Sequence, residues 1–300
     1  MIELRGKDVA AAIREQIEKD VAVMGNDIPK LAIVRAGEEA DDIAYERGAL
    51  KRMAGLGLEA ESFAFPADVG NEEFLAALKK INDDPKINGI LLLAPLPKGL
   101  DEAAATALIS PEKDIDGIGT ANKMKLYEGD TSGFAPCTAQ AVMEVLEYAN
   151  VDVTGKHVTV VGYGMTVGKP LSLMLLNKKA TVSICRSRTT QEDLKKLCLA
   201  SDIIVAATGK MGMIGPDYVK DGAVVIDVGI SMGEDGAIHG DVQFTEISEI
   251  AAMATPVPGG VGAVTTTILA KQLVRAAKLQ ETGDGSVSPL LSAANMTGFD

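Results

Sequence analysis

The chain has 300 residues, of which 47% are hydrophobic and 24% are charged, a composition that supports a sizeable core and excludes a disordered or coiled-coil protein. Its 29 basic and 42 acidic residues give a net charge of −13, so no general attraction for nucleic acid or anionic lipid exists and we expect no nucleic-acid partner. The three cysteines and two histidines have no metal-ligand spacing, so we expect no metal site.

The start of the chain does not resemble a signal peptide, because charged and apolar residues alternate over residues 1–8. The longest uncharged apolar stretch, residues 87–97, is only roughly half of the ~20 residues needed to span a bilayer, and it contains proline. We therefore expect a cytoplasmic protein with no membrane partner.

Apolar runs of strand length alternate with segments of helical period in the first half of the chain. Strands are expected over residues 31–34, 59–65 and 90–93, and helices over 40–53 and 71–81. This alternation is typical of a parallel sheet covered by helices, so the sequence predicts an α/β fold.

A second series follows a helix expected over residues 138–149 and a polar junction. Strands of similar apolar character alternate with helices through the second half. The expected strands are 157–161, 181–185, 202–207 and 223–228, and the expected helices are 167–176, 191–199 and 262–279. Strand–helix units of about 20–25 residues are typical of half of a doubly wound sheet.

A glycine-rich segment, residues 162–168, follows a predicted strand and comes directly before a predicted helix. Glycine lets the backbone turn tightly and present its N–H groups to a pyrophosphate at the helix start. The glycine spacing is one residue wider than the usual dinucleotide fingerprint, so a tight structural turn is the alternative; the strand–glycine–helix order favours a nucleotide loop. The expected cofactor-binding residues of this loop are Gly162, Tyr163, Gly164, Thr166 and Val167.

The end of the next predicted strand indicates which dinucleotide binds. An NAD site would present an acidic residue there for the ribose hydroxyl. This chain instead has Arg186, Ser187 and Arg188, with no acidic residue before Glu192. Guanidinium groups donate bidentate hydrogen bonds to phosphate, which favours NADP over the alternative of a solvated basic turn.

Several separated motifs together resemble those of the methylenetetrahydrofolate dehydrogenase/methenyltetrahydrofolate cyclohydrolase family. They occur in the family's order and span roughly residues 2–280. The motifs are Tyr45, residues 95–97, residues 113–117 (Lys-Asp-Ile-Asp-Gly), Asn122, and residues 136–138, 162–170, 226–230 and 255–262. The last of them, Thr-Pro-Val-Pro-Gly-Gly-Val-Gly, is highly specific to the family.

The resemblance implies how the chain is organised and what it does. It implies an N-terminal α/β catalytic domain over residues 1–140, a Rossmann-like NADP domain with a doubly wound parallel sheet over 141–262, a C-terminal helix over 263–285 that returns to the first domain, and a tail over 286–300. It also implies a homodimer that oxidises a tetrahydrofolate derivative, 5,10-methylenetetrahydrofolate, with NADP as the cofactor.

The resemblance also implies roles for single residues. Tyr45 would stack on the pterin and Asp116 would hydrogen-bond its amino-pyrimidine edge, which makes these two the candidate catalytic residues. Ser187 would contact the 2′-phosphate, and Ile230 would line the nicotinamide pocket. The further substrate-binding residues implied are Leu93, Pro95, Pro258, Gly259 and Val261.

This chain departs from the family where the proton is handled. The family's lysine, four residues after the tyrosine, is Ala49 here, and its glutamine is Leu93. Lys51 is a poor substitute, since on a helix it points about 200° away from Ala49. We therefore predict a dehydrogenase with weak or absent cyclohydrolase activity.

Three alternatives stay open at this point. They are a bifunctional enzyme whose proton carrier has moved elsewhere, a catalytically silent paralogue that binds folate or NADP, and a dehydrogenase for another small metabolite. A smaller departure is Tyr163, which stands where the family often has an arginine able to bind the 2′-phosphate; Arg186 and Arg188 could bind that phosphate in its place.

Overall fold

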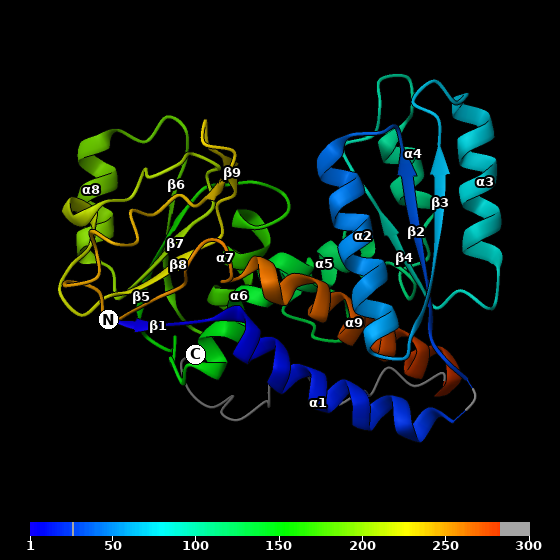
Figure 1. The fold of residues 1–300 in the computed structure, drawn as a ribbon, viewed down its shortest axis with the longest axis horizontal. Helices are drawn as coiled ribbons and strands as arrows, with labels where there is room; N and C mark the ends of the chain where they lie inside the picture. The colour runs from blue at the N-terminus through cyan, green and yellow to red at the C-terminus, as the bar shows by residue number, and fades with distance from the viewer. Residues whose placement is uncertain (26, 283–300) are drawn as a thin grey trace. The chain divides into compact units, whose positions relative to one another are not determined.

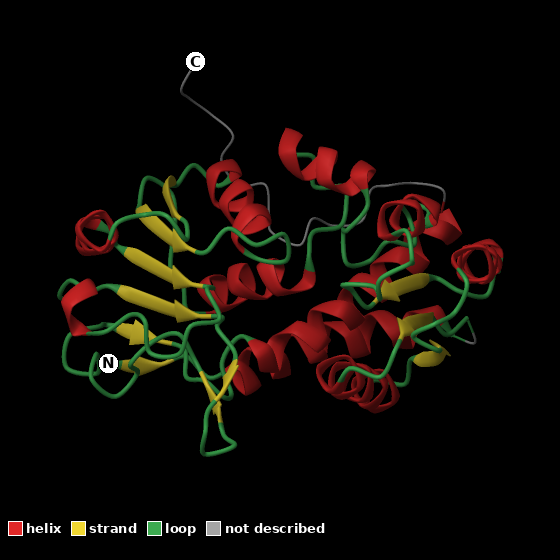
Figure 2. Ribbon diagram, turned by 90° about the horizontal axis from the view of Figure 1, so that it is seen from above, coloured by secondary structure: helices red, strands yellow, loops and turns green. Residues whose placement is uncertain are grey.

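The computed structural model describes residues 1–25 and 27–282 (Figures 1 and 2). These residues form two compact units, which we name after their main sheets. Among the described residues, the six-stranded unit contains residues 1–19 and 135–269, and the three-stranded unit contains residues 20–25, 27–134 and 270–282. The tail predicted over 286–300 lies outside the described residues, as do the last residues of the predicted C-terminal helix.

The six-stranded unit is built on a fully parallel sheet. Its strands are β1 (Ile2–Glu3), β5 (His157–Val161), β6 (Thr181–Cys185), β7 (Ile203–Ala206), β8 (Val224–Asp227) and β11 (Met253–Ala254). Their order is β1-β11-β8-β7-β5-β6, and all neighbours run parallel. The central strands β7 and β8 are buried along their whole length, which explains why they are continuous apolar runs rather than alternating ones.

Helices cover both faces of this sheet. They are α6 (Cys137–Tyr148), α7 (Gly168–Asn177) and α8 (Gln191–Ala200). The unit also contains the short 3₁₀ turn η1 (Pro216–Tyr218) and a hairpin of β9 (Ser231–Met232) with β10 (Ile238–His239). Helix α7 leads from β5 to β6, and α8 leads back past β5 to β7, so right-handed crossovers place the two helices on opposite faces (Figure 1). The predicted doubly wound parallel sheet is confirmed.

The three-stranded unit has a smaller parallel sheet with the order β3-β2-β4. Its elements are β2 (Lys30–Ala36), β3 (Glu59–Phe65), β4 (Gly89–Leu92), α2 (Ala40–Gly55), α3 (Asn71–Asp83), α4 (Glu102–Leu108) and α5 (Thr120–Glu128). Helix α3 buries Phe74, Leu78 and Ile81, a spacing that puts all three on one face. Phe74 packs edge-on against Phe65 of β3 with ring centroids 5.2 Å apart, which fixes the helix on the sheet.

Two long helices, α1 (Gly6–Met24) and α9 (Gly262–Thr282), contribute residues to both units. Beyond residue 270, α9 is bound within the three-stranded unit: Gln272 Nε2 donates to the carbonyl of Ile115 at 2.6 Å. Arg275 donates to the carbonyls of residues 131–133 at 2.7–2.8 Å, and its guanidinium lies 4.7 Å from the centre of the Phe134 ring. The predicted return of the C-terminal helix to the first domain is thereby confirmed.

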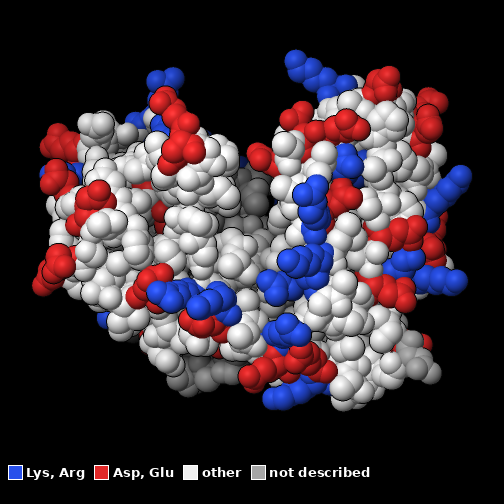
Figure 3. All heavy atoms as spheres, viewed as in Figure 1, with Lys and Arg blue, Asp and Glu red and all other residues white. Residues whose placement is uncertain are grey.

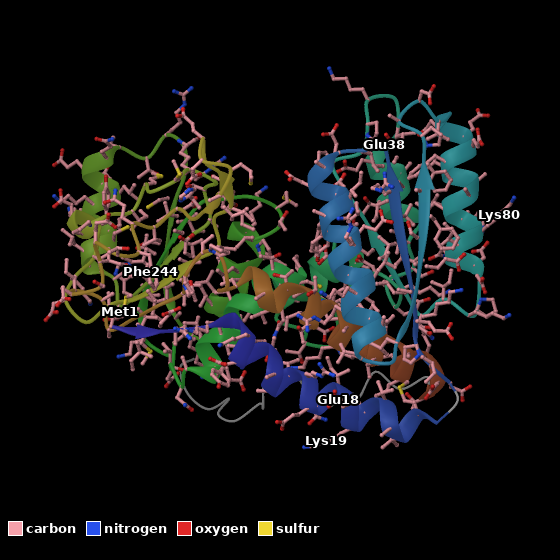
Figure 4. All side chains as sticks on the ribbon, in the orientation of Figure 1. Met1, Glu18, Lys19, Glu38, Lys80 and Phe244 are labelled. Carbon is pink, nitrogen blue, oxygen red and sulfur yellow. The ribbon has the colours of Figure 1, made fainter. Side chains whose placement is uncertain are left out.

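On the face shown in Figure 3, acidic and basic side chains are interspersed over the described surface. The charged side chains labelled in Figure 4, such as Glu38 at the entry to α2 and Lys80 on α3, extend from helices and loops rather than from the sheets. Within the described residues, none of the helices is both long and apolar enough to cross a bilayer.

Candidate functional site

The glycine loop after β5 contains two glycines that packing requires and one that it does not. A Cβ at Gly162, whose φ is +123°, would lie 2.1 Å from the carbonyl oxygen of Ala207. A Cβ at Gly168 would lie 2.2 Å from the carbonyl oxygen of Gly162, so this glycine lets the first turn of α7 pack against the loop. Nothing lies within 4 Å of the Cβ position at Gly164. Packing within the fold therefore does not require a glycine at position 164.

The ends of β5 and β6 bring aromatic and basic side chains together. Val161 is paired with Cys185, so the residues after these strands emerge at the same edge of the sheet. The guanidinium of Arg186 lies 4.8 Å from the centre of the Tyr163 ring, and the ammonium group of Lys169 lies 5.0 Å from it. Both distances are within the range of cation–π contact.

The segment predicted to bind the 2′-phosphate is a tight turn. The N–H of Arg186 donates to Thr189 Oγ1, and the N–H of Thr189 donates to the carbonyl of Arg186, both at 2.9 Å. Ser187 and Arg188 are exposed in the middle of the turn. Among the residues that the structure describes, no carboxylate forms an ion pair with Lys169, Arg186 or Arg188. This edge of an acidic protein is therefore locally positive.

A buried aspartate holds the loop that follows β8. Asp227 is 2% exposed and accepts hydrogen bonds from the N–H groups of Gly229, Asp241 and Val242 at 2.9, 3.1 and 2.8 Å. Burial and, to a smaller extent, the charge of Asp241 raise the pKa of Asp227 to about 6, although the three N–H donors act in the opposite direction. Asp227 belongs to the motif at residues 226–230, but that motif did not predict its role in holding the loop.

Asp241 does the same for the loop that follows β7. Its fully buried carboxylate accepts hydrogen bonds from the Thr208 hydroxyl at 2.8 Å and from the backbone N–H groups of residues 208–210. Parallel α/β sheets bind ligands at the carboxyl ends of their strands, where both loops lie. The two aspartates thus fix the backbone beside the predicted nicotinamide pocket.

The residues predicted around the nicotinamide and folate differ in exposure. Ile230, just after β8, is 62% exposed, an unusual exposure for isoleucine unless a ligand or partner covers it. Pro258 and Gly259 are exposed in the Pro/Gly loop, whereas Val261 is 1% exposed. The carbonyl of Gly259 accepts a 2.8 Å hydrogen bond from the N–H of Gly6, so the start of α1 anchors this loop.

In the three-stranded unit, most of the charged motif at residues 113–117 is used inside the fold. Lys113 Nζ donates to two carbonyls at the end of α3 at 2.7 and 2.8 Å, and burial lowers its pKa. Asp114 is 1% exposed and accepts hydrogen bonds from Asn122 and from two backbone N–H groups. Burial raises the pKa of Asp114 against these donors. Asp116 is only half-buried, so it is the charged residue of this motif that is most accessible to a ligand.

The positions of the family's proton-handling pair are enclosed and apolar. Ala49 on α2 is 0% exposed and Leu93, directly after β4, is 7% exposed. Tyr45, one turn before Ala49, is half-buried, and Pro95 is exposed. Lys51 is exposed, so it points away from Ala49 as the helical spacing predicts.

A partly buried ion pair that the sequence does not predict includes Glu46, the residue after Tyr45. Arg35 of β2 and Glu46 of α2 are 2.7 Å apart, and their side chains are 13% and 12% exposed. Burial acts to raise the pKa of Glu46, but hydrogen bonds from Ser62 and Arg35 outweigh it and lower the pKa. One turn earlier, burial and the charge of Glu39 raise the pKa of Asp42.

Two family models match most of the chain. The catalytic domain of tetrahydrofolate dehydrogenase/cyclohydrolase matches residues 4–116, and the NAD(P)-binding domain of the same family matches residues 136–281. The chain belongs to the tetrahydrofolate dehydrogenase/cyclohydrolase family. The predicted family is confirmed, and the six-stranded unit contains most of its NAD(P)-binding domain.

Individual relatives agree over nearly the full length. The bifunctional protein FolD of Clostridioides difficile is 47% identical over 279 residues, which cover 92% of this chain and 96% of that protein. The solved structure of the bifunctional FolD from Campylobacter jejuni has 34% identity and a TM-score of 0.89, covering 93% of this chain and 99% of that one. The Trypanosoma brucei FolD, solved with NADP and an inhibitor, has 34% identity and a TM-score of 0.89, covering 94% and 99%. The predicted fold and the prediction of NADP are confirmed by these matches.

Proposed function

We propose that this chain oxidises 5,10-methylenetetrahydrofolate to 5,10-methenyltetrahydrofolate with NADP⁺ and hydrolyses the product weakly or not at all. The observation that carries the second part is the apolar burial of positions 49 and 93. A methyl group at Ala49 and an isobutyl group at Leu93 can neither take up nor release a proton.

The two reactions make different demands on the protein. In the oxidation, a hydride passes from the methylene carbon to C4 of the nicotinamide, and a nitrogen of the substrate stabilises the cation that remains. Side chains need only hold the reactants within about 3–3.5 Å and exclude water. We assign stacking on the pterin to the half-buried Tyr45 and hydrogen bonding of its amino-pyrimidine edge to Asp116.

Hydrolysis instead requires water to add to the methenyl bridge and lose a proton. A positioned acid or base accelerates such a step by about 10²–10⁴-fold. Without a titratable group at positions 49 or 93, we expect this enzyme to lack that acceleration while keeping the oxidation.

The direct test compares both reactions on one preparation. Formation of NADPH from methylenetetrahydrofolate and NADP⁺ is followed by absorbance, and loss of methenyltetrahydrofolate is followed with and without enzyme. We expect NADPH formation, and hydrolysis at the uncatalysed rate. A clear enzyme-dependent hydrolysis would contradict the proposal, and a preparation that never reduces NADP⁺ would leave only a folate- or NADP-binding protein.

A restored pair sharpens this test. Ala49→Lys together with Leu93→Gln should raise hydrolysis above the uncatalysed rate. Because position 49 is fully buried, Ala49→Met with Leu93→Gln is the matched control for added volume. If the lysine variant keeps its dehydrogenase activity but gains no hydrolysis, the two positions do not explain the loss.

One observation favours a second candidate, a bifunctional enzyme with a relocated proton carrier. Asp42 lies three residues before Tyr45, on the same side of α2, and burial raises its pKa. If enzyme-dependent hydrolysis is found, Asp42→Asn should abolish it, whereas Lys51→Ala should leave it unchanged.

We further propose a cytoplasmic homodimer. Light scattering on the purified chain should give twice the mass of one chain, and a monomeric mass would contradict this assembly.

A further inference from the structure

The Tyr163 ring gathers two cations from different elements. Lys169 belongs to the first turn of α7, and Arg186 follows β6, yet both charged groups lie within 5.0 Å of the ring centre. Tyr163 is 38% exposed, so the two cations meet at the surface of the six-stranded unit. The two positive charges share one ring and repel each other.

Neither cation is neutralised within the described part of the chain. The hydrogen bond described for Lys169 Nζ is to Met165 Sδ, at 3.1 Å, and a thioether is a weak acceptor. No described carboxylate pairs with Lys169 or Arg186, although the chain has 42 acidic residues. Asp193 follows Arg186 by seven residues, but its carboxylate accepts a hydrogen bond from the hydroxyl of Thr190 at the start of α8.

The position of the pair matches one part of a dinucleotide. In a doubly wound sheet, the pyrophosphate lies at the glycine loop after the first strand, and the adenosine ribose lies at the end of the second strand. Here these places are residues 162–168 and the turn that begins at Arg186. Tyr163 lies in the first and its bound Arg186 in the second, so the ring connects them.

We propose that Lys169 is a ligand of the 2′-phosphate of NADP, and that Tyr163 is a positioning residue that holds Lys169 and Arg186 on either flank of that phosphate. The tyrosine carries no charge, so it cannot bind the phosphate as the arginine often found at this position in the family can. Its ring instead holds two cations that contact the phosphate. This inference rests on the proposed use of NADP and adds to it a residue, Lys169, that is not among the predicted cofactor ligands.

The test measures the binding of two fragments of NADP, so it requires neither folate nor catalytic turnover. Calorimetry measures binding of 2′,5′-ADP, which carries the 2′-phosphate, and of 5′-AMP, which does not. Lys169→Met should weaken 2′,5′-ADP by about 10- to 100-fold, the effect of one charged contact, and leave 5′-AMP unchanged. Lys196→Met, an exposed lysine of α8 in the same unit, is the matched control and should change neither.

The ring is tested by two replacements. Tyr163→Phe keeps the cation–π surface and should bind 2′,5′-ADP like the wild type, whereas Tyr163→Leu should bind about 2- to 5-fold more weakly. In the full reaction, Lys169→Met should raise the KM for NADP⁺ without changing kcat or the KM for NAD⁺, and Lys169→Arg should restore it.

Three other results would each contradict a different part of the proposal. Equal weakening of both fragments by Lys169→Met would assign this lysine to the pyrophosphate or to folding and overturn the inference. An unchanged Tyr163→Leu would overturn the role of the ring alone. If wild-type protein binds 5′-AMP as tightly as 2′,5′-ADP, the proposed use of NADP itself fails, which is a separate outcome.

Discussion

The charged motif residues of the two units are used in opposite ways. In the three-stranded unit, Lys113 and Asp114 turn inward and satisfy backbone groups of the fold. In the six-stranded unit, Lys169, Arg186 and Arg188 lie at a strand edge with no carboxylate partner among the described residues. A motif shared with a family is therefore not by itself a list of ligand contacts, because part of it is kept for folding.

The largest expected effect tests the inward use of the motif. Asp114→Ala leaves two backbone N–H groups without their acceptor and removes one of the acceptors of the Asn122 amide, which keeps the carbonyls of Pro111 and residue 114. The loss of the buried carboxylate should lower the free energy of unfolding by about 4 kcal/mol. Urea denaturation measures this loss. Asp116→Ala is the control: half-buried and proposed to bind substrate, it should lower activity far more than stability. Equal stability of the two variants would remove the contrast.

The next effect separates packing from binding within the glycine loop. Gly168→Ala places a Cβ 2.2 Å from a carbonyl oxygen and should cost about 3 kcal/mol of unfolding free energy. Gly164→Ala meets open space and should melt like the wild type, but its methyl group should weaken NADP⁺ binding. Thermal unfolding and the KM for NADP⁺, measured on both variants, give the comparison. A Gly164→Ala variant that binds NADP⁺ normally would contradict the open approach.

A smaller effect is expected from Asp227, a carboxyl group of the six-stranded unit that stabilises the fold in a pH-dependent way. The pKa of Asp227 is about 6 in the folded chain and near 4 when unfolded, so the folded state binds the proton more tightly. Its contribution, about 2–3 kcal/mol, is present below pH 4 and is lost as the pH rises through 6.

Urea unfolding between pH 4 and 7 measures this dependence. Asp227→Asn should remove the part of the pH slope that Asp227 contributes, whereas Asp221→Asn, an exposed residue of the same unit, should keep it. Identical slopes in wild type and Asp227→Asn would show that the buried carboxyl does not titrate in this range.

Much of the fold follows from local pattern. The strands over 157–161 and 181–185 are predicted with the bounds that the structure has, because runs rich in β-branched residues end at a glycine or a polar turn. The strand over 59–65 also has its predicted bounds, although it contains no β-branched residue. Helix α1 is absent from the prediction, although Val9, Ile13 and Ile17 repeat every four residues. Strands of two residues, such as β1 and β11, have no sequence pattern, since only their pairing defines them.

The candidate site could be predicted from the sequence only where its residues are close together along the chain. The glycine loop and the basic turn after β6 can be recognised from consecutive residues. The contact of Tyr163 with Arg186 joins residues 23 apart along the chain, and it exists only because β5 and β6 are neighbours. The ion pair of Arg35 with Glu46 likewise depends on the fold, because it forms only when α2 packs beside β2.

The pairing of β1 with β11 has a consequence for how the protein is made. Ile2 and Glu3 lie opposite Met253 and Ala254, so the first strand to leave the ribosome meets its neighbour near the end of synthesis. At about 5–20 residues per second, the nascent amino terminus waits for roughly 10–50 s. During translation the edge of the large sheet stays open, and a chain that stops before residue 253 has no neighbour for its first strand.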